Sequence, residues 1–177
     1  MAKWWNGRHY GLKIRCLKRR VGSTPTFGTI KIMMKKKHIL FACIHNSGRS
    51  KIAEAFFNYY VNKLNKKNIL SCSSAGTYPK KNVNTNVQKV MKEVGINIIG
   101  KPQIINNDTL SKTDMVFTMG CDIDSDKCPN ILDKKTVDWN LTDPSEKNLE
   151  EVRKIRDQID DKVKNLIQKL LTEKSIN

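Results

Sequence analysis

Residues 39–50 read Ile-Leu-Phe-Ala-Cys-Ile-His-Asn-Ser-Gly-Arg-Ser, with a cysteine at position 43 and an arginine six positions later. The apolar run Ile39–Ala42 predicts a buried strand, and the amphipathic stretch Ile52–Leu64 predicts a helix. A loop between a strand and a helix directs successive backbone N–H groups toward one point, at the positive end of the helix dipole. The sequence therefore predicts an oxyanion site, for a ligand of phosphate geometry, between the strand and the helix.

Four side chains of this loop suit chemistry on a bound oxyanion. Arg49 offers a planar pair of donors to two oxygens at once, which a lysine would not give. The positive helix end favours the thiolate of Cys43, which is the nucleophilic form. The Asn46 amide can hold the loop from inside, and the Ser50 hydroxyl can donate to the thiolate. The cysteine–arginine spacing also occurs by chance in ordinary turns, but the flanking strand and helix favour a site. We expect the loop to bind the oxyanion through Ile44, His45, Asn46, Ser47, Gly48 and Ser50.

The composition is typical of one globular domain. A chain of 177 residues can bury a sizeable core, and 38% of its residues are hydrophobic while 28% are charged. No apolar stretch approaches the length of a membrane span, and the basic N-terminus lacks the uninterrupted apolar core of a signal peptide. We therefore expect a cytoplasmic protein that has no membrane partner.

Half of the net charge of +16 lies in residues 1–33, which hold eight basic side chains and no acidic one. Back-translation of this segment allows D-arm, anticodon-arm and T-arm sequences of a leucine tRNA gene, in the correct order. We therefore expect residues 1–33 to be a disordered, non-native leader, a tRNA gene read as protein, with the native start at Met33 or Met34. A genuine basic arm that binds nucleic acid is the alternative. The remaining excess is scattered lysine, so no nucleic-acid partner is predicted.

Strand and helix patterns alternate along the rest of the chain. Strands are predicted at Ile39–Ile44, Ile69–Ser73, Met115–Met119 and Thr136–Trp139. Helices are predicted at Ile52–Lys63, Val83–Val94 and Leu149–Leu170. This alternation predicts an α/β fold, a single doubly wound domain over residues 34–177 with a four-stranded parallel sheet flanked by helices. Ligands bind beyond the carboxyl ends of such strands, where the Cys43 loop falls.

The chain also resembles a known family. The segment His38–Phe57 is similar to the phosphate-binding loop of the low-molecular-weight protein tyrosine phosphatase superfamily, which includes the thioredoxin-coupled arsenate reductases. Further matches follow in order at Ser74–Thr77, Asp114–Met119 and Asp143-Pro144, so the resemblance covers His38–Leu171. It implies the fold of that superfamily, an oxyanion substrate and Asp143 as the general acid. An aspartate before proline is also common in plain turns.

Two further cysteines bear on the choice between phosphatase and reductase. Cys121 and Cys128 flank an acid-rich segment after the third predicted strand, at the same end of the sheet as Cys43. Their spacing resembles that of the resolving pair in thioredoxin-coupled arsenate reductases, which implies that Cys121 attacks Cys43 and that Cys128 then completes the exit disulfide. Alternatively, Cys121 and Cys128 are half of a metal site, although the sequence has no second Cys or His cluster to complete it. A further alternative is that both cysteines are inert. Cys72 is expected to be a buried small hydrophobic residue.

Departures from the phosphatase pattern also favour reduction. Gly48 stands where many low-molecular-weight tyrosine phosphatases carry a second cysteine, and Ser145 follows the Asp-Pro pair where they usually have tyrosine. We therefore predict an arsenate reductase that binds arsenate or phosphate, is recharged by thioredoxin, and uses no cofactor or metal ion. A tyrosine phosphatase that hydrolyses a phospho-Cys43 intermediate is the alternative, and in a reductase the same hydrolysis would be a side reaction of this site. A non-catalytic phosphate-binding module is a third hypothesis.

Overall fold

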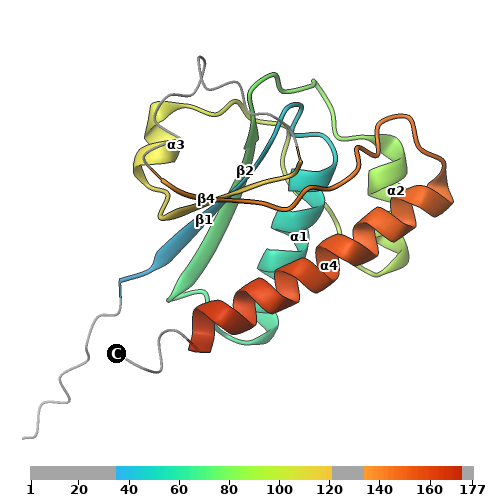
Figure 1. Ribbon diagram of the computed structural model, residues 1–177. Coiled ribbons are helices and arrows are strands. Elements are labelled where there is room, and N and C mark those ends of the chain that lie inside the picture. The colour runs from blue at the N-terminus through green and yellow to red at the C-terminus, as the bar shows by residue number, and fades with distance from the viewer. Residues whose placement is uncertain (1–34, 121–133, 173–177) are drawn as a thin grey trace, which may run out of the picture. The chain divides into compact units, whose positions relative to one another are not determined.

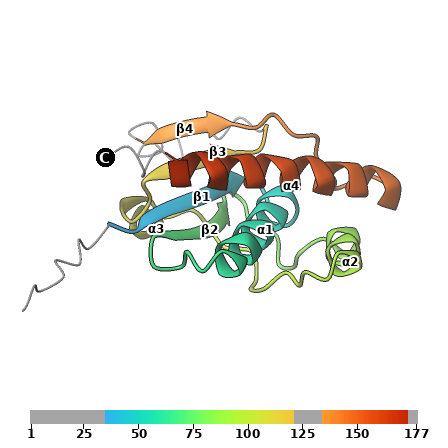
Figure 2. The same ribbon diagram turned by 90° about the horizontal axis from the view of Figure 1, so that it is seen from below.

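The computed structural model describes residues 35–120 and 134–172, which belong to one compact unit, Met34–Asn177. Its strands are β1 (Lys37–Cys43), β2 (Leu70–Gly76), β3 (Met115–Thr118) and β4 (Lys135–Asp138). Its helices are α1 (Arg49–Lys63), α2 (Thr85–Glu93), α3 (Asn107–Ser111) and α4 (Leu149–Thr172). The strands form one sheet in the order β2-β1-β3-β4, and every neighbouring pair is parallel. Figure 1 shows the sheet with its helices, and Figure 2 labels all four strands. The α/β fold with a four-stranded parallel sheet is confirmed.

The apolar run of β1 is buried on both faces of the sheet. Ile39, Phe41 and Cys43 belong to a large core cluster, whereas Leu40 and Ala42 belong to a smaller one. Successive side chains of a strand point to opposite faces, so an unbroken apolar run requires cover on both sides. Residues of α1, α2 and α4 supply the large cluster, and α3 contributes to the small one (Figure 2).

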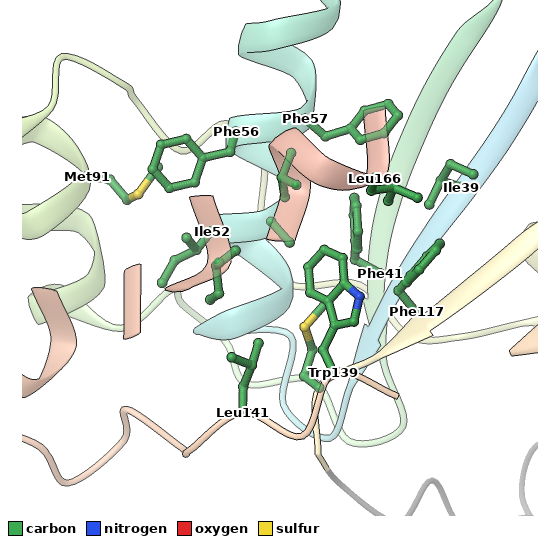
Figure 3. Packing of buried hydrophobic residues seen from close by; sticks show 14 of the residues in the cluster. Ile39, Phe41, Ile52, Phe56, Phe57, Met91, Phe117, Trp139, Leu141 and Leu166 are labelled. Carbon is green, nitrogen blue, oxygen red and sulfur yellow. The ribbon is translucent and has the colours of Figure 1, made fainter. Parts of the chain in front are cut away.

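Aromatic side chains fill the centre of the large cluster (Figure 3). The ring of Phe41 in β1 lies 5.8 Å from that of Phe57 in α1 and 5.6 Å from that of Trp139, measured between centroids. Phe117 in β3 completes the group, 6.0 Å from Phe41 and 5.3 Å from Trp139. Tilted and edge-on ring pairs of this kind stabilise a core beyond the area that they bury. They fix α1 against the sheet close to the point where β1 ends.

Several element boundaries differ from the predicted ones. Strand β2 continues past Ser73 to Gly76, and α1 begins at Arg49 rather than at Ile52. Helix α2 begins at Thr85, because the Asn84 side chain accepts hydrogen bonds from two N–H groups of its first turn. The five-residue helix α3 was not predicted, since one turn is too short to show a hydrophobic period. No helix in the described ranges is both long and apolar enough to cross a membrane.

All four strands end at the same edge of the sheet. The register pairs Cys43 with Gly76, Ala42 with Thr118, and Thr118 with Asp138. The loop after β1, the chain after β3 and the segment that follows β4 therefore emerge side by side. This edge is where open parallel sheets bind their ligands.

Candidate active site

The loop between β1 and α1 has its carbonyl groups held from outside. Four N–H groups of residues 77–84 donate to loop carbonyls at 2.8–3.3 Å. The bonds run from Thr77 to Cys43, from Tyr78 to Ile44, from Lys80 to His45 and from Asn84 to Ser47. Gly48 O accepts from Ile52 N, the first bond of α1. Because these carbonyl groups bind residues outside the loop, the N–H groups of the loop can point toward its centre. Asn46 N does so and donates to Cys43 Sγ at 3.1 Å.

Asn46 and Gly76 fix the shape of this loop. Asn46 adopts a positive φ of 47°, which asparagine tolerates better than most residues. Its Nδ2 donates to Ser50 Oγ at 2.9 Å, and its Oδ1 accepts from Gln103 N at 2.8 Å. On the outer side, a Cβ on Gly76 would lie 2.4 Å from Ile44 O, so only glycine allows the end of β2 to approach the loop. The loop is thus braced from both sides.

Cys43 lies at the base of the loop, buried, with two donors directed at its sulfur. The Ser50 oxygen lies 2.9 Å from Cys43 Sγ, and Asn46 N donates to the same atom. The Ser50 oxygen accepts from the Asn46 amide, and its hydroxyl can donate to Cys43 Sγ when the sulfur is a thiolate, which has no proton to give. Two donors on one sulfur stabilise a thiolate, so this geometry suits a nucleophilic cysteine.

Arg49 joins the loop to two other segments of the same edge. Its side chain is 6% exposed, and its Nη1 donates at 2.5 Å to both Met119 O, beyond β3, and Leu141 O, beyond β4. Its Nη2 donates to Asp143 Oδ2 at 3.0 Å. A guanidinium held by fixed acceptors provides an oriented positive charge beside the loop without further ordering.

Asp143 is ionised in this arrangement. Burial alone would raise its pKa, but hydrogen bonds from Ser145 and the nearby charges of Arg49 and His45 outweigh burial and lower the pKa below its ordinary value. Ser145 donates twice to Asp143 Oδ1, from N at 2.8 Å and from Oγ at 2.6 Å. A carboxylate that accepts these bonds has to gain a proton before it can act as a general acid.

The Ser145→Ala substitution is expected to raise the pKa of Asp143, because the Asp143 carboxylate then loses one hydrogen-bond donor. The lowered pKa of Asp143 stabilises the folded protein at pH values above about 3.9, the pKa of an aspartate in the unfolded chain. This stabilisation is lost as the pH falls through the lower pKa of the folded state. The variant should therefore lose less stability on acidification than the wild type. Carboxyl carbon NMR titration measures the pKa, with the exposed Ser111→Ala as the control. An unchanged Asp143 pKa would contradict this account of its cause.

The structure brings most of the predicted site residues to one place. The cavity over the loop has a volume of about 10 Å³, and the predicted site residues that line it are Cys43, His45, Ser47, Gly48, Arg49 and Asp143. Pro144 and Ser145 line it as well. Asn46 and Ser50 lie buried beneath, and Ile44 contributes its backbone. The predicted relay cysteines Cys121 and Cys128 lie outside the described residues. Within the described ranges, no group of three or more His, Cys, Asp or Glu side chains is placed to hold a metal ion.

Cys72 is the other cysteine that the structure describes, and it lies in β2 away from the loop. It is half-buried and packs against the large core cluster. Burial raises the pKa of its thiol, and the Glu54 carboxylate raises it further. The Cys72 thiol therefore stays protonated and is a poor nucleophile.

Sequence reasoning missed several groups that shape the site. Ser145 was noted as a departure from a pattern, not as a partner of Asp143. Gln103, Met119 and Leu141 act through backbone atoms, so their side chains give no signal. The close approach at Gly76 had one available signal, a glycine at the end of a predicted strand.

Comparisons with known proteins agree on one family. The sequence profile of the low molecular weight phosphotyrosine protein phosphatase family matches residues 38–176. An arsenate reductase of Brevibacillus brevis is 36% identical over 134 residues, which cover 75% of this chain and 95% of that protein. Arsenate reductase 1 of Staphylococcus epidermidis is 38% identical over 128 residues, 71% of this chain and 92% of that protein. The solved structure of an arsenate reductase in the phosphate-binding state superposes with a TM-score of 0.65 at 30% identity, covering 75% of this chain and 98% of that one. With a family match over most of its length, the chain belongs to the low molecular weight phosphotyrosine protein phosphatase family.

Proposed function

We propose that the protein is an arsenate reductase in which Cys43 attacks arsenate and Cys121 and Cys128 form a disulfide relay recharged by thioredoxin. The observation that carries this proposal is the buried Cys43 sulfur, which receives donors from the loop and has the Arg49 guanidinium beside its loop. A thiolate and an oriented cation together suit attack on a tetrahedral oxyanion. The relatives named arsenate reductase support arsenate as the substrate.

The first step forms a bond between sulfur and arsenic. Arsenate is bound by the loop N–H groups and Arg49, and the Cys43 thiolate attacks the arsenic atom. An arsenic–oxygen bond breaks, and the oxygen leaves as water with a proton from Asp143. Binding of an anion next to Arg49 offsets the positive charge that lowers the Asp143 pKa, so substrate helps Asp143 to take up the proton that it then gives.

The second step transfers two electrons to arsenic. The Cys121 thiolate attacks Cys43 Sγ, a sulfur–sulfur bond forms, and the sulfur–arsenic bond breaks with its electron pair remaining on arsenic, which gives arsenite. The Cys128 thiolate then attacks Cys121 and releases Cys43 as a thiolate. Thioredoxin reduces the resulting disulfide. Support for this step comes from the cysteine spacing in the sequence and from the reductase relatives.

We assign this activity to residues 34–177 and to the cytoplasm. The relay requires thiols that are returned to the reduced state after each turnover. The cytoplasm keeps protein thiols reduced, which suits such a cycle.

The test is arsenate turnover by the full chain with thioredoxin, thioredoxin reductase and NADPH. We expect NADPH oxidation to match arsenite formation one to one and to stop when thioredoxin is omitted. Hydrolysis of an aryl phosphate without arsenate reduction would instead identify a tyrosine phosphatase. Oxyanion binding without either reaction would indicate a phosphate-binding module.

A further inference from the structure

Pro144 lies directly on the loop, above Gly48. A Cβ atom added to Gly48 would lie 2.9 Å from Pro144 Cγ and 3.6 Å from Pro144 Cδ. The φ of Gly48 is −134°, so no left-handed conformation accounts for glycine at this position. A larger residue at position 48 would require the Pro144 ring to shift.

Asp143–Ser145 form a short cover over the loop. Asp143 is bound to Arg49 at 3.0 Å on one oxygen and to Ser145 on the other. A proline ring includes the backbone nitrogen, so a clash with it is relieved by a change of ring pucker or by movement of the cover, and not by rotating a side chain away. The cavity beneath holds about 10 Å³, roughly the room for one water molecule.

We propose that Gly48 and Pro144 form a gate that selects bare oxyanions over phosphate esters. This inference rests on the proposed function, because it takes the loop as the binding site of the substrate anion. A bare tetrahedral oxyanion is larger than one water molecule, so the cover shifts outward to admit it, but with no organic group attached the cover settles back toward Gly48 over the bound anion. The organic group of an ester needs further room, whereas the cover already lies close to Gly48. The cover then stays open, and the free energy of its closure is lost.

Binding measurements separate this gate from catalysis. The Cys43→Ala variant of the full chain removes the nucleophile, and calorimetry then gives the dissociation constants of inorganic phosphate, which has the geometry of arsenate, and of phenyl phosphate. We expect inorganic phosphate to bind at least about tenfold more tightly. Adding Gly48→Ala holds the cover open for both ligands, so phosphate should bind about tenfold more weakly, while phenyl phosphate should change less than about twofold.

Pro144→Gly tests the same contact from the other side and does not add bulk to the loop. It should also weaken phosphate selectively, and combining it with Gly48→Ala should produce no further loss, because both changes remove one contact. Thermal unfolding of each variant checks that it folds. If Gly48→Ala does not fold, Pro144→Gly decides the question alone.

Equal weakening of both ligands, or an unchanged ratio of their dissociation constants, would overturn the gate. Arsenate reduction by a protein that shows no such discrimination would overturn the gate and leave the proposed function standing. Selective weakening in a protein that reduces no arsenate would support the gate and refute the proposed function.

Discussion

Replacing Cys121 with serine is expected to lower thioredoxin-coupled arsenate reduction by at least roughly a thousandfold, because no thiol then attacks the arsenylated Cys43. Hydrolysis of p-nitrophenyl phosphate should change by less than about twofold, since that reaction needs only the loop, Arg49 and Asp143. A split between the two activities is the expected result. Steady-state rates of both reactions, measured on the same preparation, test it.

Cys128→Ser sharpens this experiment. With Cys121 intact and Cys128 absent, one arsenite per protein should form, and the chain should stop with Cys43 bonded to Cys121. Mass spectrometry of peptides digested without reductant identifies that disulfide. Cys72→Ser is the matched control, because burial raises the pKa of its thiol and keeps it protonated. It should leave both activities unchanged.

Two outcomes would contradict the relay. Undiminished arsenate reduction in Cys121→Ser would show that another thiol or an external reductant attacks Cys43. A loss of p-nitrophenyl phosphate hydrolysis as large as the loss of reduction would show that Cys121 supports the structure of the site instead of carrying electrons.

The fold follows from patterns that are local in the sequence. The unbroken apolar run of β1 requires cover on both faces of the sheet, and the alternation of strands with amphipathic helices allows a parallel sheet. Helix α3 could not be predicted in this way, because its single turn buries only Leu110 and depends on the Asn106 cap. Its place is set by packing against the small cluster, which involves residues distant in the chain.

In the candidate site too, some contacts could be predicted from the sequence and others could not. Cys43, Asn46 and Ser50 belong to one continuous motif, so their proximity could be expected from the loop alone. The partners of Arg49 come from positions 70 to 94 residues further on, and two of them are backbone carbonyls. Any residue type supplies a carbonyl, so no pattern of side chains could have indicated Met119 or Leu141. Only the meeting of the strand ends at one edge reveals them.

Arg49→Lys is expected to lower kcat/KM for arsenate by about a hundredfold to a thousandfold, the usual loss when one donor to a developing negative charge is removed. The ammonium of lysine is a point charge without the planar fork, so it cannot donate to Met119 O, Leu141 O and Asp143 in their present positions. Leaving buried acceptors without a donor should also lower the free energy of unfolding by about 1–3 kcal/mol. Kinetics and urea unfolding of the same variant measure the two effects.

The second buried arginine separates catalysis from stability. Arg156 lies in α4 and is 8% exposed, and its Nη1 donates to Val90 O in α2 at 3.0 Å. It makes none of the contacts described for the Cys43 loop. Arg156→Lys should therefore reduce stability to a similar extent while leaving kcat/KM within about twofold of the wild type. If Arg49→Lys and Arg156→Lys lose stability alike and both keep full turnover, Arg49 serves only to join the loop to its neighbours. A selective loss of turnover in Arg49→Lys would show that the guanidinium acts in the reaction, on the bound oxyanion or through Asp143, because Arg156→Lys matches the loss of stability.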